Sequence, residues 1–301
     1  MMAAASTEPM RGVLLHDEPM SRHTSWRVGG GADRYYQPAD VADLARFMAQ
    51  LDADEPVHWL GLGSNLLVRD GGLRGTVIAT ANLLDGFEWI DKRRLRVEAG
   101  VPCAIVARRC ARRGLVGAEF LAGIPGTFGG ALAMNAGAFG GETWALVQSV
   151  ETLDRQGQLR VRVPADYEIG YRSVRGPEGE WFIAATLEFQ AGDAEAASER
   201  IRSLLAQRAS SQPTQQANAG SVFRNPPGDH AARLIESCGL KGLCIGGACV
   251  SEKHANFIVN GGQATATDIE ALIEKVAAEV YAQRGVTLQT EVHIIGEVAH
   301  G

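Results

Sequence analysis

The chain has 301 residues, of which 46% are hydrophobic and 21% charged, and its net charge is −6. This is the composition of a globular protein long enough for two or three domains. Nucleic acid is not an expected partner, because the net charge is negative. The two short basic runs, KRRLR (92–96) and RRCARR (108–113), are typical of solvated faces.

Targeting and redox signals are weak. The N-terminal MMAAASTEPMRG has no basic region followed by an apolar core, so we do not interpret it as a secretory signal. No run approaches the roughly 18 apolar residues of a membrane helix. The five cysteines, Cys103, Cys110, Cys238, Cys244 and Cys249, form no CxxC pair, and CIGGAC (244–249) lacks metal-ligand spacing. We interpret them as buried reduced thiols of a cytoplasmic protein with no metal site.

The first half of the chain alternates predicted strands and helices. Residues 39–53 have apolar side chains at helical spacing, with Asp40 as the expected N-cap. Residues 102–114 predict a helix with Pro102 near its first turn and Gly114 as its stop. Strands are predicted over 57–63, 76–80 and 94–100.

The second half begins with a predicted hairpin, VQSVETLD and QLRVRVP, joined by RQG. The further expected elements are a strand over 181–190, a helix over 194–209, a polar link over 210–220, a helix over 266–285 and a strand over 287–296. Strands that come first as hairpins and are then followed by helices favour an α+β class over a doubly wound α/β class.

Two glycine-rich stretches stand out, GLGSNLLV (61–68) and GIPGTFGGALAMNAG (123–137). Glycine lets the backbone approach a ligand closely, and successive N–H groups can form an anion-binding concavity. Neither stretch matches the dinucleotide fingerprint or the P-loop, because an apolar strand-like run follows the first and no lysine follows the second. Taken alone, the residues leave two interpretations open: nucleotide-binding loops or tight turns.

Three polar residues lie in distant segments, Arg172 in GYR, Ser221 in NAGSVFRNP and Glu291 in QTEVHIIG. Taken singly, Ser221 is typical of a turn, and the other two are typical of surface ion pairs. Ser221 is not in a nucleophile elbow, because Phe223 stands where that motif needs glycine. In a regular strand Glu291 would share a face with His293 and lie opposite the apolar residue between them.

Together, these stretches resemble the UDP-N-acetylenolpyruvoylglucosamine reductases, flavoenzymes of the second committed step of bacterial cell-wall precursor synthesis. The matching pieces run in order from residue 23 to residue 296: HTSWRVGGGADRYYQPADVADL, LGLGSNLLVRDGGLRGTVI, EFLAGIPGTFGGALAMNAGAFGGE, GYR, NAGSVFRNP, GLKG, GGACVSEKHANFIVN and EVHIIG.

The resemblance implies an α+β fold with a two-part FAD-binding region of the vanillyl-alcohol-oxidase type and a C-terminal α+β substrate-binding domain. We expect FAD-binding subdomains over 1–80 and 81–209, a UDP-sugar-binding domain over 210–290, and a C-terminal segment over 291–301 that returns to the FAD region.

The family's glycine loops lie along the pyrophosphate and ribityl chain of FAD. The cofactor-binding residues that the resemblance implies are Gly61, Gly63, Ser64, Asn65, Leu66, Gly126, Thr127, Gly129, Gly130, Asn135 and Gly137. We expect a non-covalent FAD, because these loops contain no histidine.

The implied reaction is ping-pong. NADPH reduces FAD and leaves, and UDP-N-acetylglucosamine enolpyruvate then enters the same cleft and becomes UDP-N-acetylmuramate. Arg172 and Glu291 are expected to stabilise the enolate, and Ser221 to donate the proton to the carbon beside the carboxylate. The expected substrate contacts are Asn225, Arg224, Lys253 and His254, with Arg224 or Lys253 as candidates for the diphosphate.

The chain departs from the family pattern at two places. Phe139 stands where relatives commonly have tyrosine, and the segment after Arg172 is too short for the substrate-capping loop of the longer family type. Two alternatives stay open: an FAD oxidase or dehydrogenase for another substrate, and a non-enzymatic nucleotide-binding module. We expect a cytoplasmic monomer with small-molecule partners and no membrane insertion.

Overall fold

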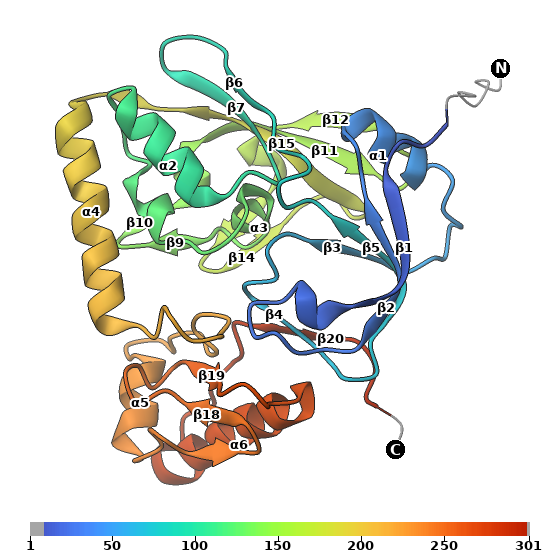
Figure 1. Cartoon of the computed structure of the whole chain (residues 1–301). Helices are drawn as coiled ribbons and strands as arrows, with labels where there is room; N and C mark the ends of the chain where they lie inside the picture. The colour runs from blue at the N-terminus through green and yellow to red at the C-terminus, as the bar shows by residue number, and fades with distance from the viewer. Residues whose placement is uncertain (1–8, 300–301) are drawn as a thin grey trace. The chain divides into compact units, whose positions relative to one another are not determined.

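The computed structural model describes residues 9–299, drawn as a ribbon in Figure 1. The chain divides into two compact units, and each is discontinuous in sequence. The first contains the residues up to 15, 35–61 and 75–204, and the second contains 16–34, 62–74 and the residues from 205 onward. The first eight residues of the stretch that we do not interpret as a secretory signal lie outside the described residues.

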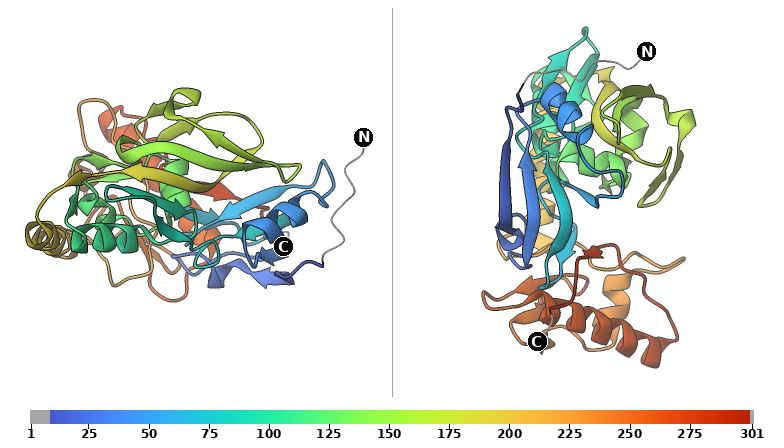
Figure 2. Two further views of the ribbon diagram at one scale, coloured as in Figure 1. Left: turned by 90° about the horizontal axis from the view of Figure 1, so that it is seen from above. Right: turned by 90° about the vertical axis from the view of Figure 1, so that its right-hand side faces the viewer.

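Two larger sheets are built from the first two-thirds of the chain. One has the strand order β1 (Val13–Pro19), β2 (Gly31–Gln37), β5 (Leu73–Ala79) and β3 (Val57–Leu60). The other has the order β12 (Leu159–Arg162), β11 (Val147–Asp154), β15 (Glu180–Glu188), β7 (Arg94–Glu98) and β6 (Phe87–Trp89). In the second sheet every pair is antiparallel, and Figure 2 shows its long strands β11 and β15 side by side. The predicted hairpin, β11 with β12, is confirmed.

Three short ribbons complete the strands of the first unit. They are β9 (Gly137–Ala138) with β10 (Gly141–Glu142), β13 (Glu168–Gly170) with β14 (Ser173–Arg175), and β8 (Leu115–Val116) with β16 (Gln190–Ala191). Short 3-10 helices are found among the described residues at Met20–Arg22, Glu119–Gly123, Thr143–Leu146 and Pro164–Asp166.

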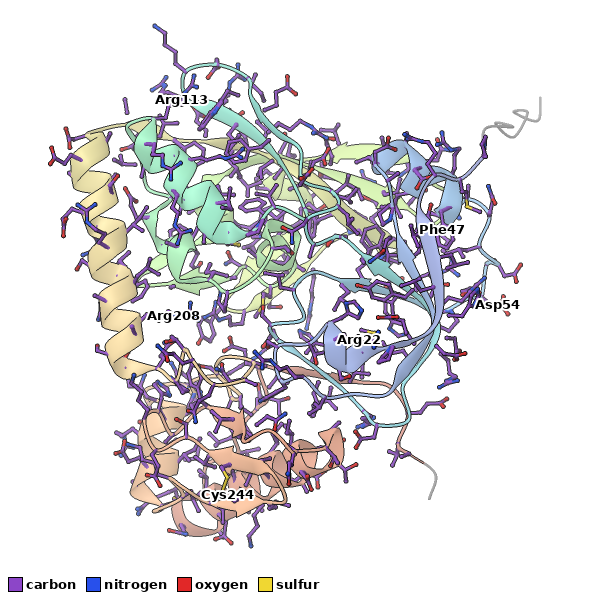
Figure 3. The ribbon with its side chains drawn as sticks, in the orientation of Figure 1. Arg22, Phe47, Asp54, Arg113, Arg208 and Cys244 are labelled. Atoms are coloured by element: carbon purple, nitrogen blue, oxygen red, sulfur yellow. A yellow bond between two sulfur atoms is a disulfide. The ribbon has the colours of Figure 1, made fainter. Side chains whose placement is uncertain are left out.

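Helix α1 (Val41–Met48) closes one apolar core of the first unit. The Asp40 side chain accepts a hydrogen bond from Asp43 N at 2.8 Å, which confirms the predicted N-cap. Phe47, labelled in Figure 3, stacks on Tyr36 with ring centroids 3.7 Å apart. The other buried members of this core are Leu44 and Met48 of α1, Ile78 of β5, Leu84 between β5 and β6, Leu153 of β11 and Ile183 of β15.

The remaining helices of this region follow the sequence closely. Helix α2 (Cys103–Arg112) begins directly after Pro102 and ends before Gly114, whose φ is +70°. Helix α3 (Phe128–Ala133) interrupts the second glycine stretch, and α4 (Ala194–Ser211) extends the predicted helix by two residues. Cys103 and Cys110 are buried in α2, and burial raises the pKa of each thiol to about 12. The prediction of buried thiols is confirmed for these two.

The second unit packs two helices on short strands. Helix α6 (Ala266–Arg284) has the Thr265 capping box at its start and Gly285 in the left-handed conformation at its end. The other elements are α5 (Ala231–Ser237), a sheet in the order β17 (Cys244–Ile245), β18 (Ala248–Val250) and β19 (Ile258–Asn260), and a parallel pair of β4 (Leu66–Val68) with β20 (His293–Ile295). Trp26 is fully buried in this core, and its indole N–H donates to Ile258 O at 2.8 Å.

The predicted strand over 287–296 is wrong in its first part, because regular pairing covers only β20. The N–H groups of Glu291 and Val292 both point to Val222 O, at 2.7 and 3.4 Å, so the segment before β20 has no alternating ladder. Glu291 and Val292 are therefore both buried, at 9% and 3% exposure, while His293 is exposed. The expectation that Glu291 and His293 share a face, opposite Val292, fails for this reason.

The prediction for the remaining cysteines is also wrong in part. Cys244 and Cys249 form a disulfide, Cys244 is exposed, and Cys249 and the free Cys238 are half-buried. The two cysteines meet because the Gly246–Gly247 turn folds β17 back onto β18. Among residues 9–299, no helix combines the length and the apolar character needed to cross a bilayer.

Candidate functional site

A cavity of about 310 Å³ lies in the first unit, between the end of β3, the second glycine stretch and β15. Such a volume is at the lower end of the range for small-molecule sites. Its lining is mostly glycine, alanine and aromatic side chains: Trp59, Leu60, Gly61, Thr80, Ala99, Gly129, Gly130, Ala133, Tyr167, Val174, Gly176, Pro177, Glu180, Trp181 and Phe182. Three of the expected cofactor residues, Gly61, Gly129 and Gly130, line it.

The two glycine stretches meet at Gly61 and Thr127. A Cβ at Gly61 would lie 2.4 Å from Thr127 Oγ1, so this approach requires glycine. The Thr127 side chain is buried and caps α3 by accepting from Gly130 N at 3.5 Å. A Cβ at Gly129 would lie 2.7 Å from Ala99 Cβ, whereas one at Gly130 would come no closer than 3.7 Å to its nearest neighbour, Thr127 Oγ1. Gly129 is therefore needed for the packing of the protein, and Gly130 leaves open space at the cavity.

Aromatic side chains line one side of the cavity. Trp59 stacks on Trp181 with ring centroids 5.4 Å apart, and Tyr167 lies 5.6 Å from Phe182. Trp59 Nε1 and Tyr167 Oη are buried, and neither has a hydrogen-bond partner among the described residues. Burial, with Glu180 nearby, raises the pKa of Tyr167 to about 12, so its hydroxyl remains a donor. Sequence reasoning missed both donors, because no local motif marks them.

Glu180 is the charged residue of the cavity lining. Its carboxylate accepts from Arg162 at 2.5 Å and from Thr152 Oγ1 at 2.7 Å. The hydrogen bond from Arg162, outweighing burial, lowers the pKa of this carboxyl. Glu180 is thus a paired anion that fixes β15 against β12 and β11 beside the cavity.

Arg172 lies in the β13–β14 turn of the first unit, where its φ of +52° makes it one of the few non-glycine residues in the left-handed region. Its guanidinium donates to Gly137 O at 3.0 Å. Asn135 donates to Gly170 O at 3.2 Å and accepts from Trp144 N at 3.1 Å. The end of the second glycine stretch therefore holds the Arg172 turn, and the Asn135 amide is engaged within the protein.

The second unit brings Ser221 and Glu291 onto neighbouring segments. Glu291 N donates to Val222 O at 2.7 Å, so Ser221 lies one residue from this contact. Asn65 of the first glycine stretch donates through Nδ2 to Glu291 O at 3.1 Å, and His293 N donates to Asn65 O at 3.1 Å. The cofactor candidate Asn65 is thus hydrogen-bonded to the catalytic candidate Glu291, and Ser221 directly precedes the residue that accepts from Glu291 N.

Asn256 holds this segment and was missed by sequence analysis. Its Oδ1 accepts from Phe223 N at 2.9 Å, its Nδ2 donates to Phe223 O at 2.8 Å, and its own carbonyl accepts from Val222 N at 2.9 Å. Both Asn256 and Phe223 are buried, at 4% and 2% exposure. The Asn256 side-chain amide thus pairs with the N–H and C=O of Phe223 as the backbone of a neighbouring strand would. The stretch HANFIVN is part of the family resemblance, but its letters do not indicate which backbone the asparagine meets.

The four substrate candidates also lie in the second unit. The Arg224 backbone N–H donates to Gln289 O at 2.9 Å, and Asn225 Oδ1 accepts from Ala231 N at 3.1 Å at the start of α5. Lys253 Nζ donates to Ala209 O at 2.5 Å. His254 lies edge-on to Phe257, and burial, with a smaller contribution from Lys241, lowers its pKa.

The other expected cofactor residues belong to backbone contacts. Gly63 O accepts from Ser25 N at 3.1 Å, and a Cβ at Gly63 would lie 2.1 Å from His23 O. Ser64 lies in the turn before β4, and Leu66 begins that strand, opposite His293. Gly126 O accepts from Cys103 N at 2.9 Å. The prediction that the first glycine stretch leads into a strand is confirmed.

Comparison with protein families identifies both parts of the chain. Residues 32–162 match the model of an FAD binding domain, and residues 212–295 match the model of the UDP-N-acetylenolpyruvoylglucosamine reductase C-terminal domain. The chain is 61% identical to the UDP-N-acetylenolpyruvoylglucosamine reductase of Methylococcus capsulatus, over 98% of this chain and 97% of the relative. It belongs to the UDP-N-acetylenolpyruvoylglucosamine reductase family. The chain is therefore a flavoprotein oxidoreductase, and the resemblance seen in its motifs is confirmed.

Other similar proteins support the same family assignment. The Alkalilimnicola ehrlichii relative is 60% identical over 98% of this chain and 99% of its own length. The crystal structure of the Thermus caldophilus reductase superposes with a TM-score of 0.81 at 33% identity, covering 95% of this chain and 99% of that one. A 6-hydroxy-D-nicotine oxidase from Arthrobacter nicotinovorans, at 12% identity and a TM-score of 0.54 over 94% of this chain and 88% of that one, shares the fold alone. The expected fold, an FAD-binding region of the vanillyl-alcohol-oxidase type with a C-terminal domain, is confirmed.

Proposed function

We propose that this chain reduces UDP-N-acetylglucosamine enolpyruvate to UDP-N-acetylmuramate in peptidoglycan precursor synthesis, with NADPH as reductant and non-covalent FAD as hydride carrier. Family membership across nearly the whole chain supports the reaction class. The observation that carries the proposal at residue level is the contact of Glu291 with Val222, next to Ser221.

We propose that the cavity of the first unit holds part of the FAD. Its volume, its glycine and aromatic lining, and the two buried donors Trp59 Nε1 and Tyr167 Oη fit a flat, acceptor-rich ring system. Gly61, Gly129, Gly130 and Thr127 bring the backbone close to that space. We further propose that Gly63, Ser64, Asn65, Leu66, Gly126, Asn135 and Gly137 serve the same cofactor, with Asn135 acting through its backbone.

When bound, FAD supplies the hydride that NADPH delivers to it. Ser221 then donates a proton to the substrate carbon beside the carboxylate, while Arg172 and Glu291 stabilise the negative charge that develops on the enolate. The hydrogen bonds of Asn256 to Phe223 support the role of Ser221, because they restrain the backbone next to it. The Gly137 carbonyl supports the role of Arg172, because it accepts from the guanidinium and so orients that side chain.

We propose that FAD binding and UDP-sugar binding are assigned to the expected domains. Residues 1–80 and 81–209 hold FAD, residues 210–290 hold the UDP-sugar through Arg224, Asn225, Lys253 and His254, and residues 291–301 return to the FAD region. The protein is proposed to work as a cytoplasmic monomer. Hydrogen exchange with and without the UDP-sugar tests the assignment. Protection is expected around Asn225, and protection confined to residues 60–140 would contradict it.

An anaerobic colour test examines the whole cycle. The purified protein is expected to be yellow, to bleach with NADPH, and to recolour when the enolpyruvyl sugar nucleotide is added without oxygen. Recolouring by oxygen alone indicates an oxidase for another substrate. A colourless preparation that FAD does not reconstitute indicates a nucleotide-binding module. Acid precipitation completes the test, because a non-covalent flavin leaves its colour in the supernatant.

A further inference from the structure

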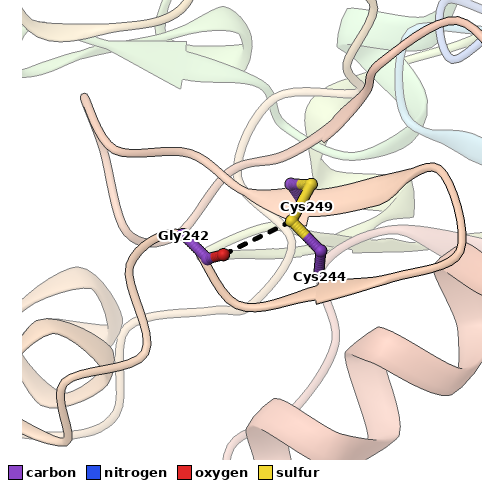
Figure 4. The surroundings of a disulfide bond; sticks show 3 residues. All are labelled: Gly242, Cys244 and Cys249. Carbon is purple, nitrogen blue, oxygen red and sulfur yellow. Dashed lines mark hydrogen bonds between the residues drawn. A yellow bond between two sulfur atoms is a disulfide. The ribbon is translucent and has the colours of Figure 1, made fainter.

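The β17–β18 hairpin carries two cysteines that the proposed reaction does not use. Cys244 and Cys249 are directly opposite in the antiparallel register, their Cα atoms are 4.1 Å apart, and their sulfurs are bonded, as Figure 4 shows. At the adjoining position Val250 N donates to Leu243 O at 2.9 Å. The cysteines therefore occupy the next, non-hydrogen-bonded pair, in which opposite side chains approach most closely.

The turn that brings the two cysteines together is fixed by contacts other than the disulfide. Gly246 has a φ of +51°, and a Cβ there would meet the Asp268 carboxylate at 2.4 Å. A Cβ at Gly247 would lie 2.4 Å from Ala264 N, and the Gly247 N–H donates to Asp268. The hairpin thus depends on the first turn of α6 for its shape, so the two thiols are held close together when they are reduced.

We propose that Cys244 and Cys249 form a reversible redox modification site that takes low-molecular-weight disulfides as oxidant and dithiols as reductant. On oxidation the two thiols lose two protons and two electrons, and the small disulfide leaves as two thiols. On reduction a thiolate attacks Cys244 Sγ, the S–S bond breaks, and Cys249 leaves as a thiolate that takes a proton from water. The second thiol of the reductant then releases Cys244.

The exposure of the two cysteines and their local contacts favour attack of a thiolate at Cys244. Cys244 is exposed and Cys249 half-buried, so an incoming thiolate meets Cys244 first. Cys244 Sγ lies 3.3 Å from Gly242 O, the dashed line of Figure 4. A disulfide sulfur has no hydrogen to donate, so this acceptor becomes useful only in the thiol form. The hairpin therefore accommodates both redox states.

The other cysteines do not compete for this chemistry. Cys103 and Cys110 are buried in α2, and burial raises the pKa of both thiols to about 12, so they are poor nucleophiles. Cys238 is half-buried and has no bonded sulfur partner among the described residues. The pair in the hairpin is therefore distinguishable from the rest by chemical reactivity.

Opening the bond changes how β18 is held. The Gly242 N–H donates to Val250 O at 3.0 Å, and the Val250 N–H donates to Leu243 O. Once the disulfide is reduced, these two hydrogen bonds hold the open end of the hairpin without a covalent link. Strand β18 leads into Ser251, whose Oγ accepts from Lys253 N at 3.1 Å. Reduction is therefore expected to loosen the start of the segment that carries Lys253, His254 and Asn256.

Thiol counting on the full-length holoprotein tests the proposal. Wild type, Cys249→Ser and the matched control Cys238→Ser are exposed to oxidised glutathione, alkylated in denaturant and weighed by mass spectrometry. Wild type and Cys238→Ser are expected to gain an internal disulfide, two hydrogens lighter than the reduced chain, that dithiothreitol reverses. Cys249→Ser is expected to carry glutathione on Cys244 instead. Alkylation of all five wild-type cysteines, or the same glutathione adduct in wild type and Cys249→Ser, would overturn the proposal.

Hydrogen exchange gives a second, independent readout. The amides of Gly242 and Val250 are expected to exchange at least about tenfold faster in the reduced protein, while the α2 amides stay unchanged. Equal exchange at Gly242 and Val250 in both redox states would show that the bond does not restrain the hairpin.

Discussion

The two units prepare their sites in opposite ways. The first unit prepares a space for a ligand: Gly130 leaves room at the cavity, and Trp59 Nε1 and Tyr167 Oη are buried donors without a partner among the described residues. The second unit prepares the position of its own chain: Asn256 satisfies both backbone groups of Phe223. A buried donor without a partner lowers the stability of the ligand-free protein, and a ligand that accepts its hydrogen bond restores that stability. A buried donor that is already paired stabilises the protein without a ligand.

The comparison predicts that variants of the first unit change ligand binding more than stability. Variants of the second unit are predicted to change stability or the chemical step.

Ser221→Ala is expected to separate the two half-reactions. Loss of a positioned general acid costs about 10²–10⁴-fold, so reoxidation of the reduced flavin by substrate slows by that factor. Reduction by NADPH stays within a few-fold of wild type, because it does not use this proton. Stopped-flow absorbance measures each half-reaction, and Ser210→Ala, whose hydroxyl donates to Gln207 O at the end of α4, serves as the control. Equal slowing of both halves would mean that Ser221 shapes the flavin site instead.

Gly130→Val is expected to remove FAD from a folded protein. Its Cβ enters open space at the cavity, so the branched side chain competes with the ligand. Gly129→Val is expected to lose folding as well, because its Cβ meets Ala99. Flavin content and circular dichroism measure the two effects. Full occupancy in Gly130→Val would show that this part of the loop is only a turn.

Asn256→Ala is expected to lower the free energy of unfolding by about 2–4 kcal/mol, because it leaves the buried N–H and C=O of Phe223 unpaired. Urea denaturation measures this loss. Asn260→Ala is the matched control. Asn260 donates to Trp26 O and accepts from Gly262 N and Ala264 N, but it is only half-buried, and water can replace it at these groups. Its removal is therefore expected to cost less, about 1 kcal/mol. A smaller loss of unfolding free energy than in Asn260→Ala would mean that the Ser221 segment does not depend on the Asn256–Phe223 hydrogen bonds.

Tyr167→Phe and Trp59→Phe are each expected to weaken FAD binding about tenfold, the loss of one hydrogen bond of about 1.4 kcal/mol. The Tyr167→Phe apo-protein is expected to keep its stability, because the hydroxyl has no partner among the described residues. Trp59→Phe is expected to lose a little stability, because the smaller ring makes fewer contacts with Trp181. Trp144→Phe is the contrasting control, since Trp144 Nε1 donates to Leu132 O at 2.8 Å and its loss destabilises the fold. Titration of apo-protein with FAD and thermal unfolding distinguish the two cases. A stability loss equal to that of Trp144→Phe would contradict the ligand role.

His254 is expected to make a small pH-dependent contribution. Burial lowers its pKa in the folded state, so the unfolded chain binds more protons as the pH falls through about 6.5. Stability is therefore lost below that pH, by less than about 1 kcal/mol per pH unit, and His254→Gln is expected to flatten this part of the profile. Denaturation between pH 5 and about pH 8 measures the slope. An unchanged slope in the variant would show that His254 does not titrate differently on folding.

Local signals in the sequence were enough to predict most helices and the family. Asp40, Pro102, Gly114 and Thr265 mark helix ends by chemistry that acts within one turn, so α2 and α6 lie where their residues predict. Helix α1 begins after its predicted N-cap but ends at Met48, five residues before the end of the helical pattern. The ordered motifs, from the glycine stretches to EVHIIG, were enough to identify a flavoprotein reductase, because each demands particular residue types at a fixed spacing. The candidates Ser221 and Glu291 also came from those motifs.

Tertiary structure decided what depends on contacts between distant segments. Glu291 lost its predicted strand alternation because Val222 O accepts the two successive N–H groups of Glu291 and Val292. Cys244 and Cys249 became a disulfide because α6 fixes the glycine turn between them. No local sequence signal marks the hydrogen bonds of Asn256 to Phe223, the buried donors of Trp59 and Tyr167, or the cavity. The physical reason is range: capping and turn chemistry act over a few residues, whereas burial and hydrogen-bond pairing depend on which distant backbone arrives beside a side chain.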